Sequence, residues 1–222
     1  MFKVKISDHV LENMTMAAIE AYCLGDGRRS GEKQLETFGY LWGSKKYAAH
    51  ETIFFLEKIS LSLSARRTSG SVTPNRKAAR LKNEVMMRWS PHTTMLGSFH
   101  THPYESLEEV KLNSGFEFSD ADFGCFQHDD FLWKESGDTP VNFAMTICKL
   151  SRVHESGFGE WRRPNLWQFD IGEFRLWLNV SVGSVDEYGN RCLTLNKKSV
   201  ATLDLNARFF NERGTRFKLD HE

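Results

Sequence analysis

The chain of 222 residues carries 29 lysine and arginine residues and 29 aspartate and glutamate residues, so its formal net charge at pH 7 is zero. That balance excludes nucleic-acid binding driven by overall charge. Hydrophobic residues make up 40% of the chain and aromatic residues 13%. This is enough to build the core of one large domain, or of one domain with an extension.

Signals for a membrane, for secretion and for paired cysteines are absent from the sequence. No apolar run reaches about 18 residues, so no membrane contact is expected, and the first residues lack the apolar segment of a signal peptide. The widely spaced cysteines, without a Cys-x-x-Cys pair, are Cys23, Cys125, Cys148 and Cys192. We therefore expect a cytoplasmic protein with buried free thiols.

Hydrophobic periodicity and capping signals divide the first 150 residues into alternating helices and strands. Residues 7–24 have apolar side chains at spacings of three and four after a capping serine, and Gly25 ends this helix. In chain order, the other predicted elements are a strand at 37–42 ending in a turn at Gly43-Ser44, a strand at 50–63, a basic loop at 64–76, a helix at 75–89, a strand at 93–99, a loop at 104–118, a helix at 120–133 and a strand at 141–150. The predicted apolar face of the helix at 75–89 comprises Ala78, Leu81, Val85 and Met86. This order predicts a mixed α/β sandwich.

The sequence changes character after residue 150, where tryptophan and phenylalanine residues stand among turn signals. We expect a β-rich extension at 151–222 that packs on the domain formed by 1–150. Residues 174–182 and 191–196 are a candidate hairpin. The pattern at 199–210 is compatible with a strand or with a short helix.

Two histidines, His100 and His102, stand at the end of a predicted strand, directly before Pro103. Side chains two residues apart lie on the same side of a strand, so both histidines can bind one metal ion. Asp122 fits as a third ligand if Ser119 caps the following helix. Three protein ligands leave one coordination position open for water, which is the pattern of a catalytic zinc site.

Together with Glu36, which precedes an apolar segment containing glycine, these residues resemble the JAMM (MPN+) metalloprotease family. The family pattern is an upstream Glu, then His-x-His-Pro, then Ser-x-x-Asp, and the resemblance covers about residues 5–150. It implies an MPN-like (cytidine-deaminase-like) mixed β-sheet flanked by helices. It also implies Zn²⁺ as the cofactor, held by His100, His102 and Asp122.

The resemblance implies catalytic roles for two further residues. Glu36 would be the general base that takes a proton from the zinc-bound water, and Ser119 would donate a hydrogen bond to the oxyanion of the tetrahedral intermediate. Zinc lowers the pKa of bound water to roughly 7, and a neighbouring carboxylate can accept the proton and return it to the leaving amine. Glu32 and Glu51 are alternatives to Glu36, and Ser119 has the alternative role of a helix cap alone.

The spacing between the His-x-His-Pro and Ser-x-x-Asp motifs is longer than the family usually has. Ser106 to Glu109 matches the second motif at shorter range, so Glu109 is an alternative third ligand. Asp122 is preferred because aspartate is the family residue and because its segment opens a better helix. Residues 104–118 would then border the mouth of the active site, where loops often determine substrate choice.

The function implied by the resemblance is that of a peptidase or isopeptidase that cleaves after the C-terminal glycine of a ubiquitin-like protein. The chain is similar to stand-alone bacterial and phage members, some of which act in ubiquitin-like conjugation or antiviral defence systems. The ubiquitin-like protein is then the expected partner, and neither nucleic acid nor a membrane is expected. The sequence leaves open whether the chain forms a homodimer. The alternatives are a non-catalytic MPN scaffold and a hydrolase or deaminase acting on a non-protein amide.

Overall fold

The computed structural model describes residues 1–26, 33–152, 159–193 and 201–206. The helices of this part of the chain are α1 (Asp8–Leu24), α2 (Arg76–Trp89), α3 (Leu107–Leu112), α4 (Asp120–Gln127) and α5 (Asp130–Glu135). Its strands are β1 (Phe2–Ile6), β2 (Phe38–Tyr47), β3 (Thr52–Leu61), β4 (Arg66–Arg67), β5 (Val72–Thr73), β6 (Thr94–Tyr104), β7 (Val141–Lys149), β8 (Glu160–Arg163), β9 (Leu166–Ile171), β10 (Phe174–Val185), β11 (Arg191–Leu193) and β12 (Ala201–Asp204).

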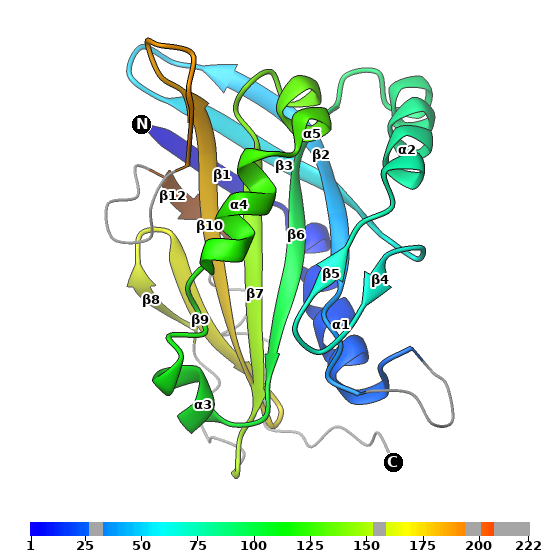
Figure 1. Cartoon of the computed structure of the whole chain (residues 1–222). Helices are drawn as coiled ribbons and strands as arrows, with labels where there is room; N and C mark the ends of the chain where they lie inside the picture. Colours follow the sequence, from blue (N-terminus) through cyan, green and yellow to red (C-terminus); the bar gives the residue numbers. More distant parts are fainter. Residues whose placement is uncertain (27–32, 153–158, 194–200, 207–222) are drawn as a thin grey trace.

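Ten of these strands form one sheet in the order β12-β1-β3-β2-β6-β7-β10-β9-β8, with β11 paired to β10. Strands β6 and β7 are parallel, and β1 is parallel to both β3 and β12. The other neighbouring strands of this sheet are antiparallel. The protein is therefore mixed α/β, with a large curled mixed sheet and few helices around it (Figure 1).

Helices cover both faces of the sheet (Figure 1). Helix α1 lies on one face, where its apolar side chains join the largest core cluster with β1, β3, β6, β7 and β10. Helices α2, α4 and α5 lie on the opposite face. Because successive side chains of a strand point to opposite faces, Phe99 of β6 enters the α1 core while His100 faces α4.

The strands that follow residue 150 extend the same sheet. Strand β10 pairs with β7, and β12 pairs with β1 at the other end of the sheet. The predicted hairpin is confirmed for β10 and β11, which pair antiparallel between Gly183–Val185 and Arg191–Leu193, just beyond the predicted end of the first strand. Its residues 194–196 lie outside the described residues. The ambiguous segment at 199–210 contains strand β12, and its remaining parts lie mostly outside the described residues. The division of the chain at residue 150 into two parts stays a prediction.

The predicted turn at Gly43 is wrong, because β2 continues through it to Tyr47. The register between β2 and β3 shifts at this position. A Cβ atom on Gly43 would lie 1.8 Å from the carbonyl oxygen of Phe55. The glycine therefore permits a close approach of two strands at a bulge, and does not form a turn.

Two predicted loops contain regular structure. Residues 64–76 include the hairpin of β4 and β5, and residues 104–118 include helix α3. The helix predicted at 120–133 is in fact two helices, because the Asp129 side chain accepts a hydrogen bond from the Leu132 amide (3.2 Å) and begins α5. Helices α3 and α5 begin at the side-chain caps Ser106 and Asp129, and such caps are weak signals in a sequence.

Helix α2 has the predicted bounds but a different buried face. Its buried residues are Ala79 and Asn83, whereas Leu81, predicted to be in the core, is 63% exposed. The indole nitrogen of Trp42 donates a hydrogen bond to Asn83 Oδ1 at 3.2 Å. This buried polar contact turns the face of α2 that carries Asn83 toward the sheet.

The expectation of buried thiols is right for two cysteines and wrong for the other two. Cys23 and Cys148 are buried, while Cys125 and Cys192 are exposed, and all four are free. None of the helices in the described ranges has both the length and the apolar character needed to cross a bilayer.

Candidate metal centre

His100 and His102 lie within β6 and not at its end, since the strand continues to Tyr104. Both project from the face of the sheet that α4 covers. His100 is 3% exposed, and its ring lies 5.7 Å from the ring of Phe126 and 6.3 Å from that of Phe118. In the neighbouring strand β7, the small residue Ala144 is the register partner of His100. This position gives the histidines an apolar surrounding with room above the strand.

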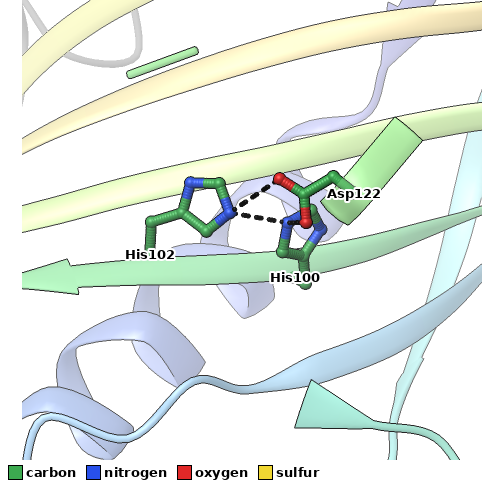
Figure 2. Close-up of side chains that lie close together, drawn as sticks. All are labelled: His100, His102 and Asp122. Carbon is green, nitrogen blue, oxygen red and sulfur yellow. Dashed lines mark hydrogen bonds and ion pairs between the residues drawn. The ribbon is translucent and has the colours of Figure 1, made fainter. Parts of the chain in front are cut away.

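Three potential ligand atoms meet where α4 begins above β6 (Figure 2). The Nε2 atoms of His100 and His102 are 2.8 Å apart. Asp122 Oδ1 lies 3.1 Å from the first and Oδ2 lies 3.2 Å from the second. Donor atoms on a tetrahedral zinc ion, each about 2.0–2.1 Å from the metal, are roughly 3.3 Å apart. The three side chains could therefore hold a metal ion with only small movements.

Ser119 fixes the carboxylate of Asp122. Its hydroxyl and its backbone amide each donate a hydrogen bond to Oδ2 at 2.8 Å, and the Asp122 amide donates to the hydroxyl at 3.1 Å. This capping box confirms Ser119 as the N-cap of α4. The hydroxyl proton points to Asp122 here, so the predicted oxyanion role requires the hydroxyl to rotate.

The ring of His102 is oriented by the segment between the two motifs. Its Nδ1 lies 3.4 Å from the carbonyl oxygen of Gly115, which also accepts a hydrogen bond from Thr146 Oγ1 at 2.7 Å. A Cβ atom at Gly115 would lie 2.4 Å from the ring of Tyr104, so a larger residue here would displace that ring. Contacts of this kind orient ligand histidines at metal sites. Gly115 could not be predicted from the sequence, because nothing in the local pattern distinguishes it from any other loop glycine.

The pKa values of the three candidate ligands reflect their burial and their contacts. Burial lowers the pKa of His100. Burial also acts to lower the pKa of His102, but the hydrogen bond and charge of Asp122 outweigh it and raise that pKa. Burial alone would raise the pKa of Asp122, and its two histidine contacts hold it well below its ordinary value. The group therefore presents an ionised carboxylate beside a neutral, buried imidazole.

Glu36 faces His102 from the segment that leads into β2, the strand that pairs with β6. Phe38 pairs with His100 in the ladder of β2 and β6, and the pairing continues because the Thr101 amide donates to the Thr37 carbonyl at 3.1 Å. The Glu36 amide donates to the carbonyl of Thr68, between β4 and β5, at 2.9 Å. Two residues before Phe38, Glu36 therefore occupies the position opposite His102.

Burial gives Glu36 an unusual acidity. The side chain is 8% exposed, and burial raises its pKa to about 7, while His102 acts to lower it and Asp122 to raise it. A carboxyl group with a pKa near neutrality is matched to proton transfer at physiological pH. Perturbed carboxyl groups of this kind gather at functional sites.

The candidate residues border one cleft of about 1070 Å³. Its walls include Glu36, His100, His102, Ser119 and Asp122, together with the β4–β5 hairpin and part of the 104–118 segment. The arrangement can place a metal ion and a carboxylate base beside the same bound substrate. That combination suits metal-assisted hydrolysis.

Glu109 was the alternative third ligand, and Glu32 and Glu51 were the alternatives to Glu36 as the base. Glu109 borders the cleft, but its carboxylate accepts a hydrogen bond from the Glu105 amide at 2.9 Å, and it is not in the metal-capable group found among the described residues. Ser106 also opens a helix, since it caps α3, but α3 has six residues whereas α4, which follows Ser119, has eight and a complete capping box. Glu51 lies in the turn between β2 and β3, and Glu32 lies outside the described residues.

We expect Ser119→Ala to weaken zinc binding roughly 10- to 100-fold, the usual effect of removing a group that orients a metal ligand. Loss of the cap should also destabilise the fold by about 1 kcal/mol. Competition with a zinc-binding dye measures the first effect, and urea unfolding the second. Ser106→Ala is the matched control, because it removes the N-cap of α3 and contacts none of the three candidate ligands. The Ser106 hydroxyl accepts a hydrogen bond from the Glu109 amide at 3.2 Å. Equal zinc affinities in the two variants would contradict the orienting role.

Glu36→Gln should stabilise the metal-free protein at pH 8 and leave it unchanged at pH 4. Below pH 4.5 the carboxyl group is protonated in both the folded and the unfolded chain, so the substitution has no effect through this group. As the pH rises from about 4.5 to about 7, the folded chain keeps this proton while the unfolded chain loses it, so the stability of the wild-type protein falls. The full shift corresponds to about 3 kcal/mol above pH 7.

Urea unfolding of both proteins in the presence of a chelator, at several pH values, measures this difference. The gain in the free energy of unfolding that Glu36→Gln gives over the wild type should grow between pH 4.5 and 7 and then level off. A constant difference across this range would contradict the assigned pKa shift of Glu36.

The fold and the site together define a mixed α/β protein with a candidate metal centre in an open cleft. No family model matches the chain, and no curated protein matches it.

Proposed function

We propose that the chain is a zinc-dependent peptidase or isopeptidase of the JAMM (MPN+) type with an MPN-like fold. The observation that carries the proposal is the position of Glu36, buried opposite His102 in the cleft that also contains His100 and Asp122. Two imidazoles and one carboxylate with an open side toward a cleft suit a catalytic zinc ion. A carboxyl group with a pKa raised to about 7 supplies the base that such a reaction needs.

Each of the proposed roles uses an atom of the chain. Nε2 of both histidines and the carboxylate of Asp122 would hold the ion, which when bound supplies Lewis acidity and lowers the pKa of water. Glu36 would accept a proton from the attacking water and deliver it to the leaving amine. Ser119 would hold Asp122 in place and, after rotation of its hydroxyl, would donate to the oxyanion.

The cleft suggests the kind of substrate. The β4–β5 hairpin borders it, with Val72 and Thr73 of β5 in its lining. An extended tail can add to the edge of such a hairpin as a further strand, with its backbone groups paired. A tail that ends in glycine meets the least steric hindrance beside the metal. We therefore propose the C-terminal glycine of a ubiquitin-like protein as the cleavage point, within a bacterial conjugation or antiviral defence system.

A non-catalytic scaffold of the same fold is the second candidate. The burial of Glu36 argues against it, because an ionisable group with a raised pKa destabilises the folded chain at neutral pH. Such a cost is expected where the group has a chemical role. A scaffold needs neither this carboxylate nor a set of three converging ligands.

The experiment uses the purified chain, loaded with zinc or treated with a chelator, and a panel of ubiquitin-like proteins fused to a short peptide. Intact mass spectrometry identifies the product. The proposal expects zinc-dependent release of a product that ends in the C-terminal glycine of at least one fusion. Bound zinc without cleavage of any fusion would favour the scaffold.

A further inference from the structure

A second pocket, of about 370 Å³, lies between α3 and the strands β8, β9 and β10. Small-molecule sites generally have volumes of roughly 300–1,000 Å³. No residue of this pocket belongs to the candidate metal centre. The pocket is formed by α3 and Phe116, from the segment between the two motifs, and by strands after residue 150.

The floor of this pocket is apolar and partly aromatic. Trp177 is 5% exposed, and Leu166 and Val110 are fully buried beside it. The ring of Phe116 lies 6.4 Å from that of Trp177, tilted by 32°. Two aromatic rings above aliphatic side chains suit a ligand with an aromatic or otherwise apolar body.

The charged part of the lining has one sign. Four lining residues are cationic and none of the lining residues is acidic; the cations are Lys111, Arg162, Arg163 and Arg175. The three arginines are paired with carboxylates outside the lining, so the rim favours a bound anion through the charge of Lys111 and the remaining N–H donors of the arginines. The pocket thus combines an apolar floor with a cationic rim.

Carboxylates outside the lining hold the three arginines in place. Arg175 makes a two-point contact with Asp170, both distances being 2.8 Å. Arg162 pairs with Glu160 at 2.5 Å, and Arg163 pairs with Glu117 at 2.7 Å. A guanidinium group has five N–H donors, so these contacts leave donors for a further acceptor.

Two of the remaining donors are buried. Nε and Nη2 of Arg163 have no hydrogen-bond partner within the described chain, and neither has Oε2 of Glu117, the carboxylate that pairs with Arg163. Unmet buried donors are rare in folded proteins, because losing hydration without a new partner is costly. The Arg163 side chain as a whole is 26% exposed, so an anion in the pocket would reach these donors only after a rotation of the guanidinium group.

Gln168 joins the apolar floor to the cationic rim. Its Oε1 accepts hydrogen bonds from Trp177 Nε1 at 2.9 Å and from Arg162 Nε at 3.0 Å. Its Nε2 donates to Glu160, the partner of Arg162, at 3.1 Å. The positions of the ring and of the guanidinium group are therefore coupled before any ligand binds.

We propose that this pocket binds a small organic anion, a carboxylate or a phosphate carried on an aromatic or apolar body. The anionic group lies against the arginines and Lys111, and the body lies on Trp177 and Phe116. This site is independent of the proposed hydrolase function, because it shares no residue with the metal centre.

Isothermal titration with four probes tests the proposal on the full chain. Phenyl phosphate and phenylacetate carry both the anion and the ring, inorganic phosphate carries only the anion, and benzyl alcohol carries only the ring. At least one aromatic anion should bind one-to-one, about tenfold or more tightly than either partial probe, since charged hydrogen bonds and ring burial both contribute. The two aromatic anions distinguish a phosphate ligand from a carboxylate ligand.

The double variant Lys111→Gln with Arg162→Gln should weaken this binding by about tenfold or more. Both side chains lie at the surface, and thermal unfolding checks that the fold is retained. Lys134→Gln on α5, outside the pocket, is the matched control. The proposal is overturned if neither aromatic anion binds below about 10 mM, if benzyl alcohol binds equally well, or if the double variant binds like the control.

Discussion

Glu36→Gln is expected to lower the turnover of a cleaved ubiquitin-like fusion by roughly 100- to 10,000-fold, the usual contribution of a general acid–base group. Glutamine has nearly the same size but cannot accept the proton. Glu36 is not one of the three converging ligands, so the variant should still bind one zinc ion per chain. Steady-state kinetics together with elemental analysis measures both quantities.

Glu51→Gln is the control for this substitution, because Glu51 lies in the β2–β3 turn, at the opposite end of β2 from Glu36. It should keep wild-type turnover. A Glu36→Gln variant that retained full turnover with bound zinc would remove Glu36 from the mechanism. A variant that lost its zinc would show that Glu36 acts as a ligand and not as a base.

Asp122→Ala is expected to lower zinc affinity by more than 100-fold and to abolish cleavage. Removing a residue that only orients a ligand costs about 10- to 100-fold, so losing the ligand should cost more. In the metal-free protein Asp122 also lies 3.1 and 3.2 Å from the two histidine rings. Competition with a chelating dye measures the affinity.

Glu109→Ala provides the comparison, because Glu109 borders the same cleft and was the alternative third ligand. Its carboxylate caps a backbone amide, so this variant should retain zinc. If Glu109→Ala lost zinc and Asp122→Ala kept it, the assignment of the third ligand would be reversed.

More of the site than of the surrounding fold could be predicted from the sequence. The His-x-His spacing and the strand period place both rings on one face, and the cap at Ser119 places Asp122 in the first turn of a helix. These are local rules, and they act within a few residues. Glu36 was named through the resemblance, and its position opposite His102 depends on the register of two strands about sixty residues apart in sequence.

Long-range contacts explain why the predicted face of α2 and the predicted turn at Gly43 were wrong and why Gly115 was not foreseen. The buried face of α2 is set by the bond between Asn83 and Trp42, which no periodicity in the helix itself reveals. Gly43 resembled a turn residue, but its role comes from the nearby backbone of Phe55. Gly115 orients His102 from a segment that has no regular pattern. In each case the determining partner lies on another element.

Zinc titration of the metal-free chain, with cleavage of a ubiquitin-like fusion as the readout, tests the central claim most directly. The account predicts no cleavage without metal and a rise in activity that saturates at one zinc ion per chain, because His100, His102 and Asp122 form a single group of three ligands among the described residues. Cleavage that persists after complete removal of zinc, or saturated zinc binding that leaves every fusion intact, would contradict it.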